Sequence, residues 1–139
     1  MEHITISRVY GNPNEIKIPE QAIDDIKDIT LGGKDVLCIY SSSAKAIYFF
    51  PVQPPVYQIK ILIYPLTPEI VAKIMSKVSE LANKVLYSTG LCLVENKCYW
   101  EGYVQEKDLF VSKEQIIKIF ETIDEIQNIE VSEIKNTEK

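Results

Sequence analysis

Hydrophobic and polar residues alternate in short runs over the first third of the chain. Residues 4–10 and 15–18 carry β-branched or other apolar side chains at alternate positions, which predicts two short strands. Over residues 20–28 the apolar positions gather on one side of a helix with acidic residues on the others, so a short amphipathic helix is expected. Apolar runs at 36–40 and 45–50 predict two further strands.

A different order of elements follows the proline-rich break at residues 51–55. The pattern beyond it predicts strand, helix, strand, strand, helix and strand. Thr67 and Pro68 form an N-cap and N1 pair that begins the first helix, and Ser112 with Gln115 forms a capping box that begins the second. The four strands are expected at 58–64, 85–94, 98–104 and 129–134. The apolar positions expected to be buried are Ile70, Val71, Ile74, Val78 and Leu81 in the first helix and Ile116, Ile117, Phe120 and Ile123 in the second.

Together these patterns predict an α+β protein with two modules, residues 1–53 and 56–135. The first module is small and rich in strands. The second has the βαββαβ order of the ferredoxin-like arrangement. Because a module of about 50 residues buries little apolar surface, we expect the N-terminal one to pair with a second copy of the chain.

The N-terminal module resembles the AbrB/MazE swapped-hairpin family over residues 4–52. The resemblance depends on Ile16-Lys17-Ile18-Pro19 at the step from strand to helix and on Gly32-Gly33-Lys34-Asp35 before the third strand. Members of this family intertwine two chains into one barrel and usually bind DNA. The resemblance therefore implies a homodimer with double-stranded DNA as a partner. The basic residues available for such a contact are Arg8, Lys17 and Lys34.

The same module departs from that family in its charges. Asn14 and Glu15 stand where the family usually has glycine and a polar or basic residue, and Ile23 and Asp24 occupy a helical turn that often carries a basic one. Carboxylates at such positions repel a polyanion whose affinity comes largely from counterion release. A dimerisation module that has kept the fold and lost the charge is therefore an alternative.

The C-terminal module resembles ACT domains over about residues 58–134, mainly in its topology. The stretch from Pro65 to Ile74 resembles the loop and helix start of that family. ACT domains bind amino acids or similar small effectors, commonly between paired modules. Glu69 stands at or beside a position where the family usually has glycine, and its carboxylate favours an ammonium group over a second carboxylate. The effector-binding residues that the resemblance implies are Leu66, Thr67, Pro68 and Glu69.

Two other protein classes share this topology, the effector module of leucine-responsive regulators and the RNA-recognition module. RNA recognition requires aromatic and basic residues on the third sequential strand. Tyr99, Trp100 and Tyr103 supply aromatic rings there, but Glu101 and the acidic composition argue against RNA. Because side chains alternate along a strand, Tyr99 and Tyr103 are expected on one face and Trp100 on the other, as core or dimer-interface residues.

The overall charge and hydropathy narrow the choice of partners. The net charge is −5 and Arg8 is the only arginine, although arginine is the side chain best suited to phosphates and guanine edges. The longest apolar runs are far shorter than the roughly 18 residues of a membrane span. A soluble, cytoplasmic protein without a membrane partner is expected.

The reactive side chains form no pattern typical of catalysis. His3 is the only histidine and no CxxC spacing occurs, so we expect no metal, no cofactor, no catalytic residue and no enzymatic activity. The odd number of cysteines does not indicate a disulfide framework, and buried thiols are expected at Cys38, Cys92 and Cys98. A two-residue turn within 95–97 would place Cys92 and Cys98 on opposite faces of a hairpin, and a three-residue turn would place them on one face.

Two functional hypotheses follow from these features. In the first, the protein is a homodimeric transcriptional regulator whose N-terminal module binds DNA and whose C-terminal module senses an amino-acid-like effector. Effector binding would then change the relative pose of the modules across Pro54-Pro55, a stiff linker. In the second, it is a ligand-binding or scaffolding dimer that touches no nucleic acid, which the acidic charge and the single arginine favour.

Overall fold

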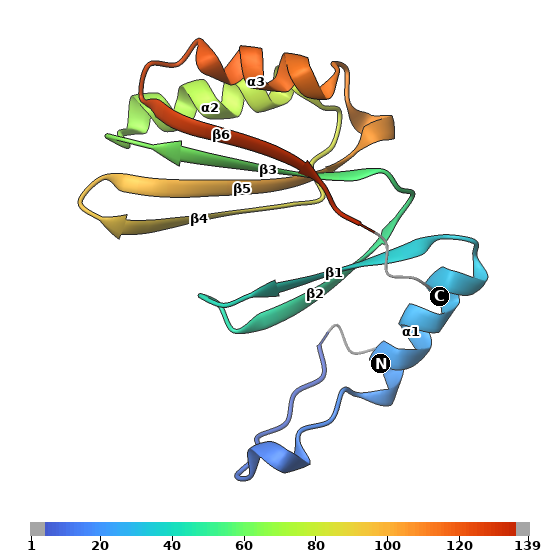
Figure 1. Cartoon of the computed structure of the whole chain (residues 1–139). Coiled ribbons are helices and arrows are strands. Elements are labelled where there is room, and N and C mark those ends of the chain that lie inside the picture. Colours follow the sequence, from blue (N-terminus) through green and yellow to red (C-terminus); the bar gives the residue numbers. More distant parts are fainter. Residues whose placement is uncertain (1–4, 136–139) are drawn as a thin grey trace.

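The computed structural model describes residues 5–135 as an α+β protein with three α-helices and two antiparallel sheets. Helices α2 and α3 cover one face of the larger sheet, and the β1–β2 hairpin lies below its other face (Figure 1). The elements in chain order are the 3-10 helix η1 (Pro13–Glu15), α1 (Glu20–Leu31), β1 (Asp35–Ser41), β2 (Ala46–Val52), β3 (Val56–Ile63), α2 (Pro68–Leu81), β4 (Tyr87–Val94), β5 (Lys97–Gln105), the 3-10 helix η2 (Glu106–Asp108), α3 (Lys113–Glu121) and β6 (Ile126–Glu133).

The larger sheet has the strand order β4-β5-β3-β6, and all neighbouring strands are antiparallel. The strand predicted at 58–64 is present as β3, which lies between β5 and β6 in the interior of the sheet. Its side chains alternate between two faces, so Ile59, Ile61 and Ile63 are buried against the helices. The intervening positions of β3 face the hairpin side of the sheet.

The helices begin where the sequence predicts. The Thr67 hydroxyl accepts a hydrogen bond from the Ile70 backbone N–H at 3.3 Å, and Ser112 and Gln115 form the complete capping box. Ile74 and Phe120 pack into the core between the helices and the sheet. Ile70, Leu81, Ile116 and Ile123 are buried as predicted. Val78 and Ile117 are half-buried, and Val71 on α2 is exposed.

The β1–β2 hairpin shares a second, smaller core with the large sheet. Leu37, Ile39 and Val52 of the hairpin are buried together with Val56 at the start of β3. Tyrosines of β4 and β5 pack against this cluster from the sheet side. The hairpin is therefore seated on the sheet through apolar contacts, although no strand is shared between the two sheets.

The segment between the two sheets is bonded to the large sheet. The Gln53 backbone N–H donates to the Gln105 side-chain oxygen at 2.8 Å, and the Glu106 N–H donates to the Pro55 carbonyl at 2.9 Å. Gln105 is itself buried. These two hydrogen bonds attach the linker to the large sheet.

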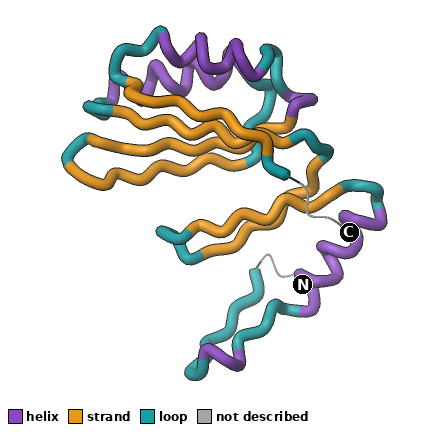
Figure 2. The backbone as a smooth tube through the Cα atoms, viewed as in Figure 1, coloured by secondary structure: helices purple, strands orange, loops and turns teal. Residues whose placement is uncertain are grey.

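The two strands predicted before α1 are absent among the described residues. Residues 5–10 and 16–19 have no regular secondary structure and run away from the hairpin as an open loop (Figure 2), with η1 at its turn. The alternating pattern there is that of a strand, but a strand also needs a neighbour for its backbone hydrogen bonds. Ile4 and His3 lie outside the described residues.

Element boundaries differ from the prediction in smaller ways. Helix α1 continues to Leu31, three residues beyond the expected end, and Gly33 with φ of 83° follows it in the left-handed region that favours glycine. Within β4, Gly90 pairs regularly with Trp100, and the register shifts between Cys92 and Val94.

That register shift changes the outcome for the cysteines. The turn at Glu95 and Asn96 has two residues, yet Cys92 lies directly opposite Cys98 and the two form a disulfide. One additional residue in β4 moves Cys92 to the face of Cys98. The prediction that these two cysteines are free, buried thiols is therefore wrong. Cys38 is also not buried, because it points outward from the hairpin.

Candidate functional site

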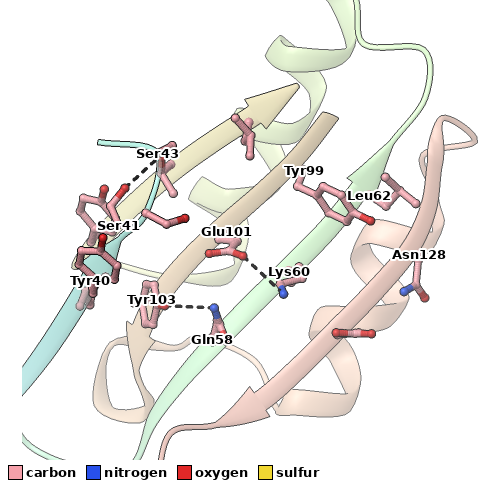
Figure 3. Close-up of a pocket in the computed structure, with 16 residues that line it drawn as sticks. Tyr40, Ser41, Ser43, Gln58, Lys60, Leu62, Tyr99, Glu101, Tyr103 and Asn128 are labelled. Carbon is pink, nitrogen blue, oxygen red and sulfur yellow. Dashed lines mark hydrogen bonds and ion pairs between the residues drawn. The ribbon is translucent and has the colours of Figure 1, made fainter. Parts of the chain in front are cut away.

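A cleft of about 570 Å³ lies between the tip of the β1–β2 hairpin and the face of the large sheet that the helices leave uncovered. Its floor consists of side chains from β3, β4, β5 and β6, and its side wall is the hairpin tip from Ile39 to Ser43. The close-up in Figure 3 shows both parts. The volume is within the range of about 300–1,000 Å³ typical of small-molecule sites.

The sheet register determines which residues form the floor. Gln58, Lys60 and Leu62 are the β3 positions that alternate with the buried isoleucines, and they pair with Tyr103, Glu101 and Tyr99 of β5. Because paired residues of antiparallel strands share a face, all six side chains face the cleft. As predicted, Tyr99 and Tyr103 lie on one face, and Trp100 packs on the other against the helix-side core.

A charged pair lies in the middle of the floor. Lys60 Nζ is 3.5 Å from Glu101 Oε1, and their side chains are 41% and 31% exposed. Glu130 of β6 also lies opposite Lys60 and lines the cleft on its other side. Lys60 therefore pairs in register with a glutamate on each neighbouring strand, and among the described residues its ion pair is with Glu101.

Aromatic and amide groups extend the floor toward the hairpin. The Gln58 Nε2 donates a hydrogen bond of 3.0 Å to the Tyr103 hydroxyl (Figure 3). The rings of Tyr87 and Tyr103 lie 6.4 Å apart. Burial raises the pKa of Tyr103 above 10, and the nearby Glu101 carboxylate and Tyr87 raise this pKa further. Tyr103 thus remains a neutral hydroxyl at physiological pH.

The hairpin tip presents serine hydroxyls to the cleft. The chain turns at residues 42–45, and the Ser41 Oγ accepts a 3.3 Å hydrogen bond from the Ala44 N–H. Ser41 and Ser43 hydroxyls are 3.4 Å apart. Lys45, with φ of 54°, donates from its ammonium group to the Ser42 carbonyl at 3.4 Å. The tip therefore supplies several hydroxyl groups that can donate or accept hydrogen bonds.

These groups can bind a small polar molecule through charge, hydrogen bonds and aromatic faces. The cleft residues include neither histidine nor cysteine. Within the described part of the chain, no three histidine, cysteine, aspartate or glutamate residues are grouped so as to hold a metal ion. The arrangement is suited to recognition of a ligand.

The structure does not bring the expected DNA-binding residues together. Arg8 and Lys17 are exposed on the segment before α1, and the Arg8 guanidinium lies 6.0 Å from the centre of the Tyr10 ring. Lys34 is exposed in the turn after α1, at the opposite end of that helix. Between them α1 exposes acidic side chains.

The residues expected to bind an effector lie away from the cleft. The Leu66 N–H donates to the Asn96 carbonyl at 2.8 Å and Thr67 caps α2, while Pro68 and Glu69 are exposed. Leu66 lines a separate apolar cavity of about 100 Å³ between α2 and the β4–β5 hairpin. The Leu66 amide and the Thr67 hydroxyl therefore form hydrogen bonds within the fold, whereas the Glu69 carboxylate stays exposed.

Sequence reasoning missed most of the cleft. Gln58 and Lys60 were visible as polar positions within an otherwise apolar strand, which is a signal for a sheet face that is not buried in a core. Thr89, Glu130 and the serine turn offered no such signal, because they meet only when the hairpin folds onto the sheet.

Comparisons with known proteins leave the chain without an assigned family. No family model, no curated protein and no solved structure matches it.

Among the residues that the structure describes, no helix is both long and apolar enough to cross a membrane.

Proposed function

We propose that the protein is a homodimer that binds a small molecule in the cleft between the hairpin and the sheet, and that this binding requires no nucleic acid. The observation that carries the proposal is the composition of the cleft. One wall belongs to residues 39–43 and the floor belongs to β3–β6, so a bound molecule contacts both parts of the chain. A ligand there would add contacts between the hairpin and the sheet to those of their shared core.

The arrangement of the C-terminal part supports a ferredoxin-like module related in form to ACT domains. Its strand order is β4-β5-β3-β6, and both helices lie on one face (Figure 1). The ligand position that we propose differs from the loop at 66–69 that the resemblance implies. It lies on the open face of the sheet, where the charged and aromatic side chains meet.

Exposed apolar surface in the N-terminal part supports the dimer. The hairpin buries Leu37 and Ile39 against the sheet, but its outer face also carries large apolar side chains, with Ile47 55% and Phe49 36% exposed. A two-stranded sheet is marginally stable at best. Further exposed apolar residues on the segment before α1 are Ile6, Val9, Ile16 and Ile18. The strand-like segment of a second copy, laid on the outer face, would cover both surfaces in the way that the swapped-hairpin resemblance implies.

Calorimetric titration with a panel of amino acids and small amines tests the cleft. We expect at least one compound to bind the full-length protein in a saturable way. Thr89→Phe, which places a ring in the cleft, should reduce that binding by tenfold or more. Thr122→Phe is the matched control, because Thr122 is exposed at the end of α3. Equal binding to both variants would contradict the proposed site.

DNA binding is the second candidate function. Arg8 and Lys17 are both exposed on the same segment, and a homodimer would carry two copies of each. Gel-shift titrations at low salt, with and without amino acids, test it. DNA binding that is weaker in the Arg8→Ala variant, and that falls steeply as salt is added, would favour a DNA-binding regulator. The acidic side chains of α1 predict that no shift occurs.

A further inference from the structure

We infer that the cleft binds an organic cation, that is, a small molecule carrying a protonated amine or guanidinium group. This inference rests on the proposed function, because it assigns a ligand class to the same cleft. The reasons are the charge balance of the floor, the position of the tyrosine rings and the poor match of the cleft to other ligand classes.

The floor carries more negative than positive charge. Lys60 contributes one ammonium group, while Glu101 and Glu130 contribute two carboxylates from the strands on either side of it. Among the described residues Lys60 forms its ion pair with Glu101, and Glu130 forms none. The ammonium of Lys45 lies at the hairpin tip and is directed at the Ser42 carbonyl. A carboxylate on the floor is thus available to a positively charged ligand.

The tyrosines form the complementary part of the cleft. Tyr87, Tyr99 and Tyr103 line it from β4 and β5, and all three are half-buried. The face of an aromatic ring attracts a cation within about 6 Å of its centre. The serine hydroxyls of the hairpin tip can accept hydrogen bonds from an N–H donor. Carboxylate, ring face and hydroxyl are the three kinds of group that an ammonium ion prefers.

Other ligand classes fit less well. An anion would have to compete with Glu101 for Lys60 and would meet the second carboxylate of Glu130. An apolar molecule would remove these charged groups from water without replacing their hydrogen bonds, which is costly. A zwitterionic amino acid is expected to bind less tightly than a diamine of similar length, since its carboxylate faces the same repulsion.

Three compounds of equal length separate these classes: 1,5-diaminopentane, 1,5-pentanediol and glutarate. Each is titrated calorimetrically into the full-length protein at low ionic strength. We expect saturable binding of the diamine, and binding of the diol and glutarate that is weaker by tenfold or more. Glu130→Gln should weaken diamine binding by about tenfold, the effect of losing one charged hydrogen bond.

Glu133→Gln is the matched control. It removes the same charge from the same strand, but Glu133 pairs with Tyr57 and does not line the cleft. Equal loss of diamine affinity in both variants would show general attraction by an acidic protein and would overturn the inference. If the diol or glutarate binds more tightly than the diamine, and Thr89→Phe abolishes this binding, the inferred ligand class is wrong. The cleft would still be a binding site. The proposed function itself fails if Thr89→Phe abolishes the binding of none of these compounds and of none of the amino acids and small amines in the wider panel.

Discussion

At the scale of single residues, Gly102 shows how a glycine makes room for an aromatic ring. A Cβ at this position would overlap the indole ring of Trp100, whereas a Cβ at Gly90 on the adjacent strand would make an ordinary contact with the Tyr99 carbonyl oxygen at 3.5 Å. We predict that Gly102→Ala destabilises the protein by about 1–3 kcal/mol, the usual cost of overpacking. Gly90→Ala should change stability by much less. Urea denaturation of the two variants measures the difference, and equal stabilities would contradict the packing argument.

The half-buried hydroxyl of Tyr103 predicts a dependence of stability on alkaline pH. Burial, followed by Glu101 and Tyr87, raises the pKa of Tyr103 above its ordinary value of 10.0 in the folded state. A raised pKa means that folding favours the neutral hydroxyl, so this contribution to stability is complete below pH 10 and is lost as the pH rises through the folded-state pKa. The Tyr103→Phe variant lacks this ionisable group, so its unfolding free energy should decline less steeply above pH 10 than that of the parent protein. Phenolate absorbance showing that Tyr103 ionises at or below pH 10 would contradict this prediction.

Residue patterns predicted the helix caps and most of the buried positions, because these depend on neighbours within a few residues. Thr67, Ser112 and Gln115 are examples, since each forms its predicted bond inside one helical turn. The cleft could not be predicted, because it depends on residues that are far apart in the sequence. Lys60 and Glu130 are 70 positions apart and become neighbours only through the register of β3 with β6.

At the scale of elements, the β4–β5 hairpin shows how one residue alters a prediction. Because side chains alternate along a strand, a two-residue turn alone would place Cys92 and Cys98 on opposite faces of the hairpin. The register shift between Cys92 and Val94 brings them onto the same face. Such an irregularity depends on the paired strand and leaves no clear trace in the sequence. The strands predicted before α1 fail for a related reason, because the pattern indicates a preference for pairing and not the presence of a partner.

The disulfide provides a prediction for this hairpin. It links residues six positions apart, and closing such a short loop is expected to stabilise the folded state by about 2 kcal/mol. Reduction, or Cys92→Ser, should lower the unfolding free energy by that order. Cys38→Ser is the control, because Cys38 is exposed and outside the disulfide. Unfolding curves that coincide with and without reductant would contradict a stabilising role.

At the scale of the whole molecule, the exposed apolar face of the hairpin predicts the oligomeric state. Phe49 lies on that face and is 36% exposed, while Phe110, in the loop before α3, is 65% exposed. If a second copy covers the hairpin, Phe49→Glu would bury an unpaired carboxylate in the interface and should yield monomers. Phe110→Glu should leave the dimer intact. Sedimentation equilibrium distinguishes these cases, and a monomeric parent protein would contradict the dimer.

The central claim is that a small molecule binds where the hairpin meets the open face of the sheet. Backbone amide chemical shifts recorded during titration with 1,5-diaminopentane test this claim most directly. The account predicts saturable shifts at Ser42, Lys60, Glu101 and Glu130, and unchanged amides at 66–69. Shifts confined to that loop, or no saturable shift in the cleft, would contradict it.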